Sequence, residues 1–77
     1  MKLKKGIDAV QFLKQVNQCS DEVLFCTQEG DVINLKSKLS QMVFAVAAAD
    51  AEMMETASIV CKNKADEEGI REFLTKP

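Results

Sequence analysis

The sequence predicts one α+β domain with the element order strand, helix, strand, strand, helix, strand, helix. Three observations support this fold class. The chain has 77 residues, which is the size of a single small domain. Its 47% hydrophobic and 29% charged residues are typical of a globular protein. Segments that alternate with a period of two residues are interleaved with segments whose apolar residues recur every three or four positions. We therefore treat residues 1–77 as one domain.

The first strand and helix are expected within the first 18 residues. Residues 1–5 form a short strand with Leu3 as its inward side chain, and Gly6 turns the chain. Asp8 followed three positions later by Gln11 is a capping-box pattern. A helix of two to three turns should follow, with an apolar face of Ala9, Val10, Phe12, Leu13 and Val16.

A β-hairpin is predicted next. Residues 22–28 and 32–35 are rich in β-branched and apolar side chains, and the turn at Gly30 separates them. Alternation places Phe25 toward the helices.

The second helix is expected to run from Ser37 to about Ala48. Its core-facing stripe is read from helical spacing as Leu39, Met42, Val43, Val46 and Ala47, and Phe44 lies off that stripe. Ser37 is the predicted N-cap, with its hydroxyl accepting a hydrogen bond from an amide in residues 38–40.

Residues 47–55 are rich in alanine, methionine and acid, and either extend this helix or form a second short one. Residues 56–62 are the last predicted strand. The acidic run 65–68 should then begin a final helix, whose apolar face is Ile70, Phe73 and Leu74.

Several function classes are excluded by what the chain lacks. There is no histidine, no Ser/His/Asp set, no Gly-rich phosphate loop and no metal-ligand spacing, so we expect no enzyme, metal or cofactor. The net charge of −2 and the absence of a basic cluster argue against nucleic acid. No apolar run approaches the ~20 residues of a membrane span, so a cytoplasmic protein is expected. The three cysteines are expected to be buried or half-buried free thiols.

The segment Ile33-Asn34-Leu35-Lys36-Ser37 resembles the regulatory-serine segment of the HPr family, the phosphocarriers of the bacterial sugar phosphotransferase system. The resemblance implies a two-layer open-faced sandwich, βαββαβα, with a four-stranded antiparallel sheet in the order 1-4-2-3 under three helices. It also implies that Ser37 is phosphorylated by HPr kinase, and that a docking patch follows it at Leu39, Met42 and Phe44. Lys38 stands where the family has an aliphatic residue.

The same resemblance places the family's phosphohistidine on Gly6 and its arginine on Asp8. Neither residue can carry or steady a phosphoryl group, and a carboxylate repels phosphate. The chain therefore cannot be an ordinary phosphocarrier. A histidine-lacking regulatory relative, the catabolite repression form of HPr, is the nearest precedent in the family.

In a two-layer domain the outer face of the sheet meets water and should be polar. Here alternation gives that face four apolar or weakly polar residues: Leu24, Cys26, Val32 and Val60. We expect a protein partner to cover them, most simply a second copy of the chain in a two-fold homodimer.

Two functions remain open. The first is a non-catalytic HPr-like regulator that acts through protein contacts and is switched at Ser37. The second is a structural or assembly module that uses the outer sheet face, with Ser37 only a helix cap. A third reading, anion binding between Lys36 and Lys38, ranks last because exposed lysine pairs usually face only water.

Overall fold

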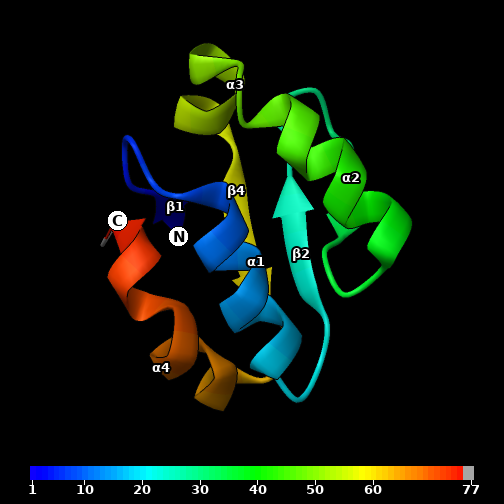
Figure 1. Cartoon of the computed structure of the whole chain (residues 1–77), viewed down its shortest axis with the longest axis vertical. Coiled ribbons are helices and arrows are strands. Elements are labelled where there is room, and N and C mark those ends of the chain that lie inside the picture. Colours follow the sequence, from blue (N-terminus) through cyan, green and yellow to red (C-terminus); the bar gives the residue numbers. More distant parts are fainter. Residues whose placement is uncertain (76–77) are drawn as a thin grey trace.

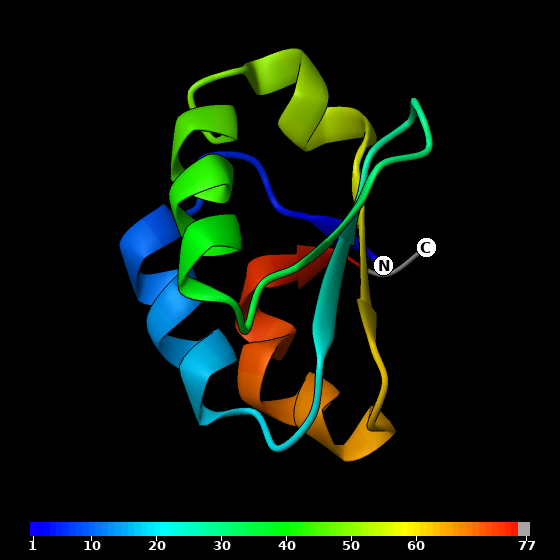
Figure 2. The ribbon, with the colours of Figure 1, turned by 90° about the vertical axis from the view of Figure 1, so that its right-hand side faces the viewer.

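Helices pack on one face of an open antiparallel sheet in the computed structural model, which describes residues 1–75 (Figures 1 and 2). The strands are β1 Lys2–Leu3, β2 Val23–Cys26, β3 Val32–Asn34, β4 Ser58–Cys61 and β5 Leu74–Thr75, in the spatial order β3-β2-β4-β1-β5. The helices are α1 Ala9–Gln18, α2 Lys38–Ala47, α3 Ala51–Thr56 and α4 Glu67–Ile70, with 3-10 turns η1 Lys64–Asp66 and η2 Arg71–Phe73 on either side of α4.

This sheet contains the predicted strand order 1-4-2-3, but it has a fifth strand that the sequence did not indicate. Leu74 was assigned to the apolar face of a last helix. In the structure α4 is short, and Leu74 pairs with Leu3 while Thr75 pairs with Lys2. The prediction of an open antiparallel α+β sheet with helices is confirmed, whereas the predicted number of four strands is wrong, because the described residues form five.

The core is organised around the four phenylalanines. Their ring centroids form a chain in which Phe73 lies 5.4 Å from Phe12, Phe12 lies 5.5 Å from Phe44, and Phe44 lies 5.1 Å from Phe25. These contacts join η2, α1, α2 and β2, and each such pair adds about 0.5–1.5 kcal/mol beyond area burial. Leu3 is buried beside this core, as predicted.

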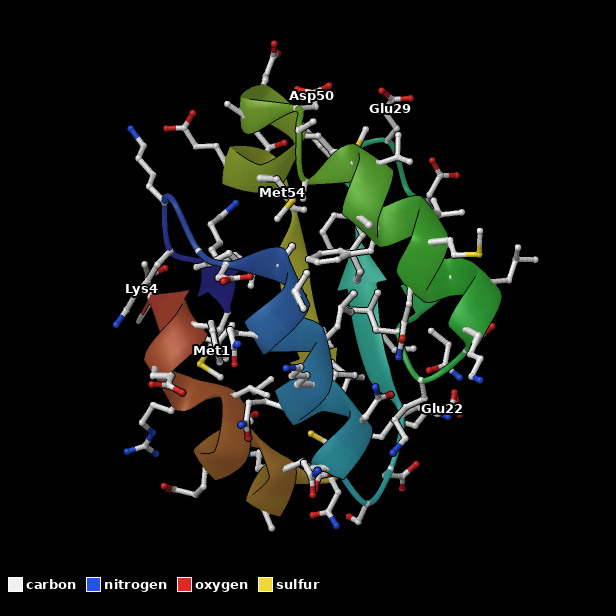
Figure 3. The ribbon with its side chains drawn as sticks, viewed as in Figure 1. Met1, Lys4, Glu22, Glu29, Asp50 and Met54 are labelled. Atoms are coloured by element: carbon white, nitrogen blue, oxygen red, sulfur yellow. The ribbon has the colours of Figure 1, made fainter. Side chains whose placement is uncertain are left out.

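The alanine- and methionine-rich segment forms the separate helix α3, one of the two outcomes expected for it. The Asp50 carboxylate caps α3 by accepting a hydrogen bond from the Met53 amide at 3.1 Å. Figure 3 shows Asp50 at the junction with α2, and Met54 on the side of α3 that faces the rest of the molecule. Both Met53 and Met54 are half-buried against the core. No helix in residues 1–75 is long and apolar enough to cross a bilayer.

Candidate functional site: Ser37 and the outer face of α2

Ser37 lies immediately before α2, in the extended backbone conformation of an N-cap. Its carbonyl accepts the first helical hydrogen bond, from the Gln41 amide at 2.9 Å. The predicted cap through its side chain is wrong, because the hydroxyl makes no hydrogen bond to the amides of α2. The Ser37 side chain is exposed, so its hydroxyl is open to solvent. Because this hydroxyl makes no capping bond, the amides of the first turn of α2 have no acceptor from Ser37.

The loop that delivers Ser37 is held by side chains of its neighbours. The Asn34 side chain accepts a hydrogen bond from the Lys36 amide at 3.0 Å, and the Ser37 amide donates to the Asn34 carbonyl at 3.1 Å. The Lys36 ammonium donates to the carbonyl of Cys19, at the end of α1. This contact occupies Lys36 and leaves the anion-binding interpretation with Lys38 alone. The loop therefore presents Ser37 from a fixed position.

Gln41 ties the start of α2 to its surroundings. Its side-chain amide nitrogen, Nε2, donates to the Leu35 carbonyl at 2.8 Å and to the Asn17 side-chain oxygen at 2.7 Å. The first turn of α2 is thereby fixed against both α1 and the preceding loop.

The apolar stripe of α2 faces away from the core, opposite to the sequence prediction. Leu39, Met42, Val43 and Val46 are 72%, 67%, 48% and 77% exposed, and we call these four residues the α2 outer face. Phe44 is instead completely buried between Phe12 and Phe25. Of the predicted docking patch, Leu39 and Met42 lie on the surface, whereas Phe44 belongs to the core.

Sequence reasoning missed Val43 and Val46 as surface residues because α2 is apolar on every side. Its periodicity alone could not show which side meets the sheet. A signal was nevertheless present, since residues 39–49 contain no charged side chain. A helix that lacks a charged face is normally covered on all sides.

Gly6 and Asp8, the two positions on which the resemblance places a phosphohistidine and an arginine, have structural roles here. Gly6 has φ of +69°, a left-handed conformation that suits glycine in the turn after β1. The Asp8 carboxylate caps α1 by accepting from the amides of Val10 and Gln11 at 3.0 and 3.2 Å, which confirms it as a cap. Among the described residues this turn holds no nucleophile or phosphate ligand set.

A hollow of about 420 Å³ lies between this turn and α3. Leu3, Ile7 and Met54 contribute apolar lining, and the Lys5 ammonium lies 3.6 Å from the Glu55 carboxylate beside them. The alanine- and methionine-rich segment therefore lies beside the turn at Gly6.

The outer sheet patch consists of Leu24, Cys26, Val32 and Val60, and it points away from the helices as predicted. Leu24 pairs with Val60, and Cys26 pairs with Val32. Val32 and Val60 are exposed, whereas Leu24 and Cys26 are half-buried. The pairing places all four side chains on the face opposite the buried Phe25.

The cysteines are free thiols, with Cys19 and Cys61 buried and Cys26 half-buried, in agreement with prediction. Burial, followed by the nearby Cys19, raises the pKa of Cys61 to about 11. Burial and then the Asp66 carboxylate raise the pKa of Cys19. Both thiols stay protonated at neutral pH and are poor nucleophiles. Within residues 1–75 no group of three histidine, cysteine or acidic side chains could hold a metal ion.

Comparisons with known proteins found no match for this chain among protein-family models, curated proteins or solved structures.

Proposed function

We propose that this chain is a non-catalytic HPr-like regulatory protein of the bacterial cytoplasm, unable to carry phosphohistidine, which is phosphorylated on Ser37 and acts through protein contacts. The observation that carries the proposal is the exposed Ser37 hydroxyl, free of a capping bond, at the start of a helix whose outer face is apolar. The strand order of the sheet, which contains that of the HPr family, supports it.

A phosphate on Ser37 suits this position electrostatically. Kinase transfer would join the Ser37 oxygen to the γ-phosphorus of ATP, release ADP and give up the hydroxyl proton. The product carries about −1.5 to −2 charges at neutral pH. The amides of residues 38–40 at the positive end of the helix dipole lack a side-chain acceptor from Ser37, so they are free to bind the phosphate oxygens.

The direct test is incubation of the pure protein with HPr kinase and ATP, followed by intact-mass analysis and peptide mapping. We expect one phosphate on the wild type, mapped to Ser37, and none on Ser37→Ala. The control Ser40→Ala alters the next serine of α2 and should still be phosphorylated. An unmodified wild type, beside an authentic HPr that is phosphorylated in the same reaction, would contradict the proposal.

The outer sheet patch supports a second candidate, an assembly module in which Ser37 only begins a helix. Val32 and Val60 expose apolar surface on a sheet face that no helix covers in residues 1–75 (Figure 2). In this case Ser37→Ala would leave assembly unchanged, whereas Val32→Glu would abolish it. Sedimentation of the Val32→Glu variant beside the wild type separates the two candidates.

A further inference from the structure

The α2 outer face is the largest group of exposed apolar side chains among the described residues. Its four side chains stand at positions i, i+3, i+4 and i+7, so they form one continuous stripe along the helix. All four are 48% exposed or more, and no described residue covers them. We propose that this stripe is the interface of a homodimer, in which α2 of one copy packs antiparallel against α2 of a second copy. This inference does not depend on phosphorylation of Ser37.

The stripe matches itself under a two-fold axis. In such a dimer each contact occurs twice, with residue i meeting residue j and residue j meeting residue i. Placing the axis between Met42 and Val43 puts Met42 opposite Val43 of the second copy. It also puts Leu39 opposite Val46 of the second copy. Large and small apolar side chains then alternate along the seam, as close helix packing requires.

The charges at the two ends of α2 favour antiparallel packing, and they favour a second copy of the chain as the partner. The N-terminal end carries the exposed Lys38, whereas the α2–α3 junction carries the exposed Asp50 and Glu52. Lys38 is exposed and forms no ion pair with a described residue. Antiparallel packing brings each basic end to the acidic end of the other copy, and it also pairs the helix dipoles favourably. Parallel packing would place like charges together.

The size of the surface sets the strength of the dimer. A standard interface removes about 800 Å² from each partner. That is a large share of the 5021 Å² accessible surface of this chain, and one helix stripe covers less. We therefore expect a dissociation constant in the micromolar range, about 1–100 μM.

The first test is sedimentation equilibrium of the wild type and of Met42→Glu over micromolar to submillimolar concentrations. The new carboxylates would meet at the two-fold axis, so the dissociation constant should rise at least ~100-fold. Met42 is 67% exposed, and circular dichroism should show that the variant remains folded.

Val10→Glu and Val32→Glu are matched controls. Val10 on α1 and Val32 on the outer sheet patch are 63% and 61% exposed, so each variant adds the same charge to a similarly exposed apolar site. We expect both to dimerise like the wild type. A wild type that is monomeric at every concentration, or a dimer lost in Val32→Glu and kept in Met42→Glu, would overturn the proposal.

The orientation is tested by oxidising an equimolar mixture of Leu39→Cys and Val46→Cys, both in a Cys26→Ser background. Positions 39 and 46 are about 10 Å apart along a helix, and a disulfide needs Cα atoms within about 7 Å. Antiparallel packing should give mainly the mixed disulfide. Preferential linkage of each variant with itself would indicate parallel packing and contradict the inference.

Discussion

The chain has two apolar surfaces on opposite sides, the α2 outer face and the outer sheet patch, and they differ in how far their own neighbours shield them (Figure 2). On the sheet, Leu24 lies beside both Val60 and Asn34, and Cys26 lies beside both Val32 and Ser58. These cross-strand pairs leave Leu24 and Cys26 only half-exposed. Side chains on an isolated helix surface have no such neighbours, and Val46 is 77% exposed. The α2 outer face therefore has more to gain from a partner.

The largest expected effect comes from the opposite side of the same helix. Phe44→Ala removes one of the two inner rings of the phenylalanine chain and should lower the free energy of unfolding by about 3–5 kcal/mol. Met42→Ala, a truncation on the α2 outer face, should change it by no more than ~0.5 kcal/mol when measured at concentrations where the chain is monomeric. Urea unfolding at low micromolar concentration measures both.

Equal losses for the two variants would contradict this orientation of α2. A larger loss for Met42→Ala would mean that the helix is rotated and that its stripe belongs to the core.

The contrast between β2 and α2 shows how much of the fold and of the site the sequence could predict. In β2, alternate residues lie on opposite faces, so placing Phe25 in the core also determined the direction of Leu24 and Cys26. In α2, apolar residues occur on every side, and the inward face is decided by the contacts of Phe44 with rings from α1 and β2. Those contacts are distant in sequence, so local periodicity could not predict them.

Capping showed the same limit. The Asp8 and Asp50 carboxylates cap the helices that follow them, since short acidic side chains easily reach the free amides. Ser37 occupies the equivalent position without a side-chain bond, and the Asn34 and Gln41 side chains hold the surrounding loop instead. β5 was missed because a two-residue strand exists only through its pairing with β1.

The next effect in size links Ser37 to the proposed dimer. In an antiparallel pair, a negative charge at Ser37 would lie near the negative end of the other copy's α2 and near its Asp50. Ser37→Asp should therefore weaken dimerisation about tenfold. In the monomer the same charge lies at the positive end of its own helix and should raise stability by about 0.3–1 kcal/mol. The two effects have opposite signs, which a general loss of folding could not produce.

Ser37→Asn is the matched control, because asparagine suits the same position without charge. Sedimentation measures the dimer, and urea unfolding at low concentration measures the monomer. Tighter association of Ser37→Asp would contradict the antiparallel arrangement.

A smaller effect is expected from acid, through the Asp66 carboxylate that joins η1 to the residues after α1. The Asp66 carboxylate accepts hydrogen bonds from the Ser20 amide at 2.9 Å, the Asp21 amide at 3.0 Å and the Ser20 hydroxyl at 3.1 Å. The Ser20 amide is the main cause that holds the pKa of Asp66 below its usual 3.8. The folded pKa is the lower one, so this stabilisation is complete above about pH 4 and is lost as pH falls through the folded pKa.

Urea unfolding of the wild type and Asp66→Asn at neutral pH and between pH 4 and 2 measures this contribution. We expect a shallower loss of stability with acid in Asp66→Asn. Glu68→Gln removes an exposed carboxylate that pairs with the exposed Arg71, and the variant should retain the wild-type pH dependence. Parallel curves for the wild type and Asp66→Asn would assign the acid sensitivity to other carboxylates.

The smallest effect is expected on the outer sheet patch. The double variant Val32→Thr and Val60→Thr keeps the branched shape that a strand favours and makes two exposed side chains polar. If cross-strand neighbours already shield this patch enough, the free energy of unfolding should change by less than about 0.5 kcal/mol per substitution, with no change in association. A marked loss of self-association would instead mean that this patch is the interface. The α2 outer face would then be available to a different protein. The outer sheet patch, and not the α2 outer face, would be the surface that gains more from self-association.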